Sequence, residues 1–202
     1  MKRAQKDGTL AAILWHQGES DCMKRGGYLY QARFPVLVNR LRQELGAEGV
    51  PLIVGQLAQE NAKGWFGKII SNNQQYTCEY LYGPGAFVKS LDSYKLNPDK
   101  VHLTRDAQVD FGKRYFKAWK DVKDKLAADP QYWKKLKPPK DLEKAYPIPE
   151  EQLLDIGGMQ LTPEIERYLF PDGVPEALEK AREAADGAAS SPGRPRGAAT
   201  RP

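Results

Sequence analysis

Three apolar runs alternate with segments of helical periodicity. In residues 9–15 and 51–57 the apolar side chains are nearly continuous, which is typical of strands covered on both faces. The predicted strands are residues 9–15, 51–57 and 86–91, and the predicted helices, from apolar positions at helical spacing, are residues 28–45, 69–82 and 104–122. This order predicts an α/β domain with a parallel sheet, whose right-handed crossovers bring the loops after the strands together at one edge.

The chain changes character near residue 120. Prolines at positions 130, 138, 139, 147 and 149 interrupt Lys-rich and helical pieces. Short helices are predicted in residues 162–170 and 175–185, each with a proline near its start. The predicted organisation is a polar lead over residues 1–8, an α/β domain over 9–119, a Pro-interrupted helical extension over 120–186 and a disordered tail over 187–202.

The formal net charge of +5 arises from one stretch of the chain. Residues 113–142 hold ten basic and four acidic side chains. No aromatic-interleaved basic motif accompanies them, so we interpret the stretch as a solvated helical face with a Lys-rich linker and expect no nucleic-acid partner. A basic partner-binding protein is the weakest alternative, and it would bind in a strongly salt-dependent way.

No apolar run is as long as a membrane span, and residues 1–8 lack the apolar core of a signal peptide. We therefore expect a soluble protein without a membrane partner. The sequence does not indicate its compartment.

Polar residues that can carry chemistry follow two of the predicted strands. The first strand runs into Trp15-His16-Gln17-Gly18-Glu19-Ser20-Asp21, and Asp99-Lys100-Val101-His102 follows the third. In open α/β sheets, ligands bind outside the carboxyl ends of the strands. These two stretches are therefore expected to form one site.

Taken with residues 53–57, the His16-Gln17-Gly18-Glu19 and Asp99-x-x-His102 stretches resemble the carbohydrate O-acetylesterases. These are the sialate O-acetylesterase and acetylxylan esterase relatives within the SGNH hydrolase superfamily. The resemblance covers about residues 9–119. It implies a flavodoxin-like, three-layer α/β/α fold and the hydrolysis of acetyl esters on carbohydrates by a Ser-His-Asp triad, without a metal or other cofactor. An acetylated carbohydrate is the implied partner.

The resemblance also implies a role for single residues. His102 would be the general base, and Asp99 would orient and charge-stabilise its imidazole. Gln17 would donate a hydrogen bond to the oxyanion of the tetrahedral intermediate. Gly18 would let the backbone approach the substrate closely.

Two further residues of the first stretch belong to the implied site. Glu19 would hold the loop by accepting hydrogen bonds, and His16 would line the wall on the sugar side.

One block of the family's pattern is not found at its expected position. The family's nucleophilic serine lies on a loop after a strand that precedes the His-Gln-Gly-Glu block, and residues 1–14 contain no serine. We therefore expect the nucleophile, the main oxyanion glycine and their strand to be absent, and the domain to be incomplete at its N-terminus. A missing N-terminal segment or chain would be a partner, and residues 9–15 would form an open strand edge.

Other interpretations of the same residues stay open. Ser20 could be the nucleophile, although neighbouring carboxylates disfavour an alkoxide and no Gly-x-Ser-x-Gly elbow surrounds it. The two histidines and nearby carboxylates lack the usual spacing of a zinc site, so no metal is expected. His102 could be a surface loop histidine, and Gln17 and Glu19 polar packing at a strand end. An ester hydrolase and a non-catalytic, sugar-binding remnant are thus both candidate functions.

Overall fold

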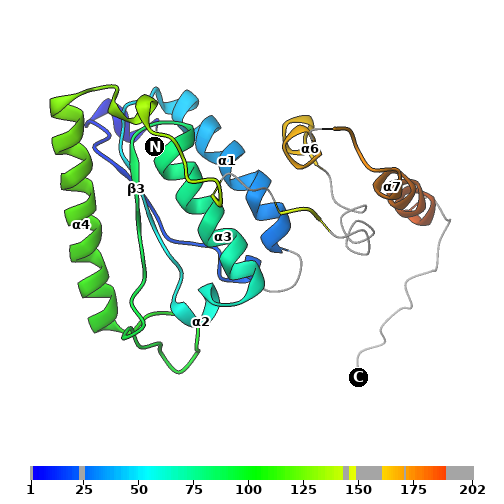
Figure 1. Ribbon diagram of the computed structural model, residues 1–202, viewed down its shortest axis with the longest axis horizontal. Coiled ribbons are helices and arrows are strands. Elements are labelled where there is room, and N and C mark those ends of the chain that lie inside the picture. The colour runs from blue at the N-terminus through cyan, green and yellow to red at the C-terminus, as the bar shows by residue number, and fades with distance from the viewer. Residues whose placement is uncertain (1, 23–25, 143–145, 149–160, 171, 190–202) are drawn as a thin grey trace, which may run out of the picture. The chain divides into compact units, whose positions relative to one another are not determined.

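The computed structural model describes residues 2–22, 26–142, 146–148, 161–170 and 172–189. Figure 1 shows the chain with its elements labelled. In chain order the elements are the 3-10 turn η1 (Ala4–Lys6), β1 (Ile13–Trp15), the 3-10 turn η2 (Ser20–Cys22), α1 (Gly26–Leu45), β2 (Leu52–Gly55), α2 (Gln59–Ala62), α3 (Trp65–Tyr76), the π-helical turn η3 (Thr77–Leu81), β3 (Gly85–Val88), α4 (Arg105–Ala128), the 3-10 turn η4 (Tyr132–Lys135), α6 (Pro163–Leu169) and α7 (Glu176–Ala189).

The three strands form one parallel sheet in the order β1-β2-β3. Residue Leu52 of β2 is paired with Ile13 on one side and with Gly85 on the other. Figure 1 shows α1 and α3 on one face of the sheet and α4 on the other. The predicted α/β architecture with a parallel sheet is confirmed, and β1 stands at one edge of the sheet.

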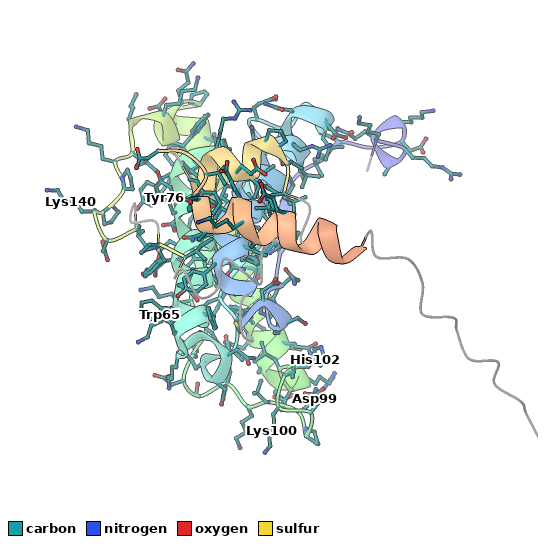
Figure 2. All side chains as sticks on the ribbon, turned by 90° about the vertical axis from the view of Figure 1, so that its right-hand side faces the viewer. Trp65, Tyr76, Asp99, Lys100, His102 and Lys140 are labelled. Atoms are coloured by element: carbon teal, nitrogen blue, oxygen red, sulfur yellow. The ribbon has the colours of Figure 1, made fainter. Side chains whose placement is uncertain are left out.

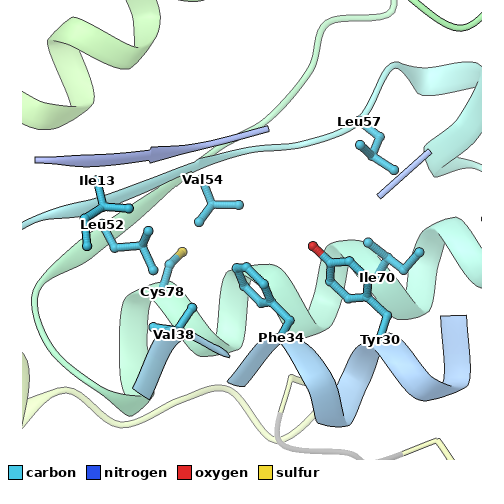
Figure 3. Close-up of a cluster of buried hydrophobic side chains, with 9 residues drawn as sticks. All are labelled: Ile13, Tyr30, Phe34, Val38, Leu52, Val54, Leu57, Ile70 and Cys78. Carbon is cyan, nitrogen blue, oxygen red and sulfur yellow. The ribbon is translucent and has the colours of Figure 1, made fainter. Parts of the chain in front are cut away.

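The side chains of β2 divide between two cores. Leu52 and Val54 pack with Phe34 on the side of α1 and α3, as Figure 3 shows. Ile53, between them in sequence, packs with Phe111 on the side of α4. Successive strand side chains point to opposite faces, so a strand between two helical layers must be apolar throughout. The prediction of a strand covered on both faces is thus confirmed for β2, but it is wrong for β1, where Leu14 is 63% exposed because β1 is an edge strand.

Several element bounds differ from the prediction. The first strand begins at Ile13 rather than at residue 9, and the third covers residues 85–88 rather than 86–91. The ladder is short because β2 supplies only four residues for pairing. The second predicted helix corresponds to α3, which starts at Trp65 and continues through η3, and the third corresponds to α4, which runs on to Ala128. The polar residues at positions 71–73 do not break α3, because Asn73 is buried and donates to the Gln31 carbonyl at 2.9 Å.

A buried arginine binds the backbone just before β2 and just before β3. Arg42, on α1, is 2% exposed. Its Nη1 donates to the carbonyls of Ala47 (2.8 Å), Glu48 (3.2 Å) and Val50 (2.7 Å), and its Nη2 donates to Pro84 (3.1 Å). Burial lowers the pKa of the guanidinium to about 10. One side chain therefore fixes the turn into β2 and the start of β3.

The described residues from Ile148 onwards belong to a second compact unit. Its helices α6 and α7 match the two short helices predicted there. The Thr162 hydroxyl caps α6 by accepting from the backbone N–H of Ile165 at 3.4 Å. Arg182 of α7 pairs with Glu166 of α6 at 2.6 Å.

The predicted tail is only partly described. Its first residues, 187–189, belong to α7, and residues 190–202 lie outside the described part of the chain. Within the described residues, no helix combines the length and apolar character needed to cross a membrane.

Candidate active site

The loop from β3 to α4 carries Asp99 and His102. An antiparallel bridge between Leu96 and Leu103 closes its base. The backbone N–H of Asn97 donates to the carbonyl of His102 at 2.8 Å, and the Asn97 amide donates to that of Leu103 at 3.2 Å. Lys100, between Asn97 and His102 in the sequence, has a φ of 58°, in the left-handed region. The loop is therefore a tight, self-bonded turn.

The structure brings Asp99 and His102 into contact. Oδ1 of Asp99 accepts the backbone N–H groups of Val101 and His102, both at 2.9 Å, and Oδ2 lies 2.9 Å from His102 Nδ1. The two backbone N–H groups, with the imidazole, lower the pKa of Asp99 to about 2. The hydrogen bond to Asp99 raises the pKa of His102, and the charge of Glu19 adds to this shift. The carboxylate thus stabilises the imidazolium form and holds Nδ1.

The loop after β1 is fixed by its backbone. The carbonyl of Gln17 accepts from the amide of Gln74 at 2.8 Å and from the hydroxyl of Tyr30 at 3.2 Å. Gly18 has a φ of 138° and is buried against Ile70, where a Cβ atom would lie 3.2 Å from a methyl group. A side chain at Gly18 would therefore be strained and crowded.

Side chains in this loop bind one another. The Glu19 carboxylate accepts the backbone N–H of Gly18 at 3.1 Å, and the Gln17 amide donates to Asp21 at 3.2 Å. With this arrangement Glu19 supports the loop through its neighbour's backbone, while the side-chain amide of Gln17 is bound to a carboxylate.

A cavity of about 660 Å³ lies where this loop, the Asp99–His102 loop and α4 meet. Its volume lies within the range of small-molecule sites. His102, His16 and Glu19 line it; Asp99, Gln17 and Gly18 are not among its lining residues. The remaining lining is largely apolar and is contributed by Ala11, Ala12, Leu14, Trp15, Ala58, Val101, Leu103, Gln108, Phe111, Gly112, Tyr115, Phe116 and Trp119.

Sequence reasoning missed the side chains that hold the end of β1. The hydroxyl of Tyr115, on α4, donates to the carbonyl of Trp15 at 2.8 Å. On the opposite face, Tyr30 accepts from the Trp15 indole at 3.1 Å and from Gln74 at 2.8 Å. The sequence shows Tyr115 only as part of an apolar helix face. The glycine at the end of the second strand, Gly55, is a signal in the sequence that another group approaches the backbone closely. In the structure this group is the Tyr115 hydroxyl, which a Cβ atom at Gly55 would overlap.

His16 packs its ring edge-on against Phe111, with centroids 5.4 Å apart. Ser20 lies in η2 and does not line the cavity. Over the described residues, no group of three or more His, Cys, Asp or Glu side chains is arranged to hold a metal ion. The cavity thus offers the imidazoles of His102 and His16 and the carboxylate of Glu19, and the polar groups of Gln108, Tyr115 and Trp119 also belong to its lining.

Comparison with known proteins decides the family. A family model described as carbohydrate esterase, sialic acid-specific acetylesterase, matches residues 1–121. The chain belongs to this family. Neither the curated proteins nor the solved structures yielded a match. The region shared with the carbohydrate esterases contains the whole sheet, the loop after β1 and the Asp99–His102 pair, and it ends within α4.

Proposed function

We propose that this carbohydrate esterase chain supplies the histidine–aspartate pair of a Ser-His-Asp hydrolase that removes acetyl groups from sugars. A serine hydroxyl attacks the acetyl carbonyl while His102 takes the hydroxyl proton. His102 then gives this proton to the departing sugar oxygen, and water releases acetate from the acyl-enzyme. Asp99 holds the imidazole and stabilises its cationic form. Substrates of this class are O-acetylated sialic acids and acetylated xylan.

One observation carries the proposal: Asp99 Oδ2 is 2.9 Å from Nδ1 of a histidine that lines a 660 Å³ cavity. With Nδ1 bound to the carboxylate, the other ring nitrogen is the one available to a nucleophile. The apolar lining suits the acetyl methyl group, and His16 and Glu19 are polar partners for sugar hydroxyls. The layered parallel sheet is compatible with the flavodoxin-like fold of the SGNH superfamily.

The oxyanion donor follows less directly from the geometry. Gln17 must exchange its bond to Asp21 for one to the substrate. The cost of that exchange is small, because both side chains are at the surface and water replaces the lost partner.

The nucleophile is a separate part of the proposal. In the described chain, no serine is among the cavity-lining residues, and Ser71 and Ser90 are buried elsewhere. We place the nucleophilic serine outside this chain, on a preceding segment or a partner chain. The chain alone then retains binding and base catalysis but lacks the acyl-enzyme route.

The test is hydrolysis of p-nitrophenyl acetate, an activated acetyl ester that a histidine–carboxylate pair can cleave slowly without serine. We expect a low rate that is lost in His102→Ala and reduced in Asp99→Asn, while Asp92→Asn, at an exposed carboxylate paired with Lys63, leaves it unchanged. A rate that is the same in His102→Ala and in the unaltered protein would refute the proposed base.

Treatment with a fluorophosphonate, followed by peptide mapping, tests the nucleophile. No adduct is expected on the folded chain. An adduct on Ser20 that disappears in His102→Ala would instead place the whole triad within this chain.

A further inference from the structure

An exposed tryptophan lies away from the cavity. Trp65, the first residue of α3, is 56% exposed, although its indole Nε1 donates to the Tyr28 hydroxyl at 3.0 Å. It is not among the residues that line the cavity. Figure 2 shows Trp65 on one flank of the lower half of the view and Asp99 and His102 on the other. This aromatic surface is therefore separate from the site already described.

A tyrosine from beyond the family match completes this surface. The ring of Tyr146 stands at 88° to that of Trp65, with centroids 5.6 Å apart. Gln31 of α1 holds the Tyr146 backbone at both polar atoms, donating to its carbonyl at 2.7 Å and accepting its N–H at 3.0 Å. Asn72 donates to the Tyr146 hydroxyl at 2.7 Å. Four polar or aromatic contacts thus fix one tyrosine beside one tryptophan.

The base of this corner is also rigid. Tyr28 is 5% exposed and packs edge-on against Phe66 at 5.3 Å. Gly27 leaves room for this contact, since a Cβ atom there would lie 2.8 Å from the Phe66 side chain. The Trp65 ring is therefore held at its polar edge and flanked by Tyr146, while more than half of its surface stays open to water. Such pre-ordering lowers the entropy that a ligand must overcome on binding.

We propose that the Trp65–Tyr146 corner binds a pyranose ring of an oligosaccharide. A sugar ring presents an apolar C–H face, which suits a flat indole, and a rim of hydroxyl groups, which suit nearby amide and phenol groups. The groups that hold the corner, on Tyr28, Gln31 and Asn72, are neutral. That chemistry favours an uncharged ring over an anion such as a phosphate.

The proposal rests on the proposed function and extends it. Trp65 lies outside the cavity that His102 lines, and Figure 2 shows the two residues on opposite flanks. The corner binds a second ring of a longer carbohydrate, and it explains one role of the segment that follows residue 121. The chain would therefore prefer oligosaccharides and polysaccharides over free monosaccharides.

The experiment follows the indole N–H resonances of the four tryptophans by ¹H–¹⁵N correlation spectra during titration. The probes are sialyllactose and xylohexaose, each also compared with its monosaccharide. We expect the Trp65 resonance to shift with one of the oligosaccharides. Trp65→Ala should then weaken binding at least about tenfold, the scale of losing one central aromatic contact. Tyr146→Ala should weaken it less, and Trp133→Ala, a control at a half-buried tryptophan of η4, should leave it unchanged.

The outcomes separate the two proposals. No shift of the Trp65 resonance with either oligosaccharide, or equal affinity in Trp65→Ala, overturns the sugar corner. If the Trp65 resonance shifts on addition of a peptide but with neither oligosaccharide, the proposal is overturned in favour of a protein partner. His102→Ala should keep this binding while losing ester hydrolysis. If binding persists and His102-dependent hydrolysis is absent, the failure lies in the proposed function instead.

Discussion

Replacing Arg42 by methionine tests the clearest structural inference about this domain. The substitution keeps an unbranched apolar stem but removes a guanidinium that binds four backbone carbonyls, those of Ala47, Glu48, Val50 and Pro84. At 2% exposure the site admits little water to replace those bonds. All four carbonyls would lose a donor in the turn into β2 and at the start of β3, and those of Ala47 and Pro84 would keep one backbone N–H each, from Val50 and Leu52.

The expected loss follows from opposing terms. A hydrogen bond to a charged group contributes about 1.5–3 kcal/mol, but removing the guanidinium also removes the cost of burying its charge. With four bonds lost and that cost regained, we expect the free energy of unfolding to fall by about 3–5 kcal/mol, as for other broken buried charge networks. With a urea m-value of about 2 kcal/mol/M, the unfolding midpoint would fall by about 1.5–2.5 M.

Urea unfolding followed by tryptophan fluorescence measures this change. The matched control is Arg40→Met, because Arg40 lies half a turn away on α1, exposes 69% of its side chain and pairs with Glu44 at 3.6 Å. That variant should stay within about 0.5 kcal/mol of the unaltered protein. A loss below about 1 kcal/mol for Arg42→Met, or equal losses for the two variants, would refute the view that Arg42 holds these turns together.

Three further predictions concern the site. Gly55→Ala should destabilise the domain by about 1–3 kcal/mol in the same urea assay, because the added methyl overlaps the Tyr115 hydroxyl; an unchanged midpoint would contradict this packing. Tyr115→Phe should cost about 1 kcal/mol through the lost bond to the Trp15 carbonyl, and should broaden the His16 NMR signals if that bond orders the loop. Asp99→Asn should lower the pKa of His102 towards its ordinary value in an NMR titration; a pKa that stays raised would assign the shift to other charges.

The same pair gives a pH dependence of stability with a definite sign. The raised pKa of His102 means that its stabilising contribution is fully present below its unfolded pKa and is lost as the pH rises through the folded value. The lowered pKa of Asp99 means that its contribution is present above its unfolded pKa and is lost as the pH falls towards about 2. Both groups are exposed, so high salt should weaken the dependence. Urea midpoints measured from pH 3 to pH 9 in the protein and in Asp99→Asn test the signs: the variant's curve should be flatter at both ends.

Much of the fold was predictable because it depends on local patterns. The continuous apolar stretch around Ile53 is typical of a strand covered on both faces, and the alternation of such strands with helical segments predicted the layered parallel sheet. The ends of β1 and β3 were predicted less well. A strand ends where its neighbour stops pairing with it, and the sequence of one strand alone does not specify that pairing.

The sequence by itself also determined the Asp99–His102 pair. The two residues are three positions apart, and the carboxylate binds the backbone N–H groups of Val101 and His102 as well as the imidazole, so a short turn suffices to form it. Only the tertiary structure decided what surrounds that pair. Tyr115 reaches the Trp15 carbonyl across a separation of 100 residues, and Gln31 holds Tyr146 across 115. Such contacts depend on how the helices pack against the sheet and against each other, and no local pattern in the chain specifies that packing.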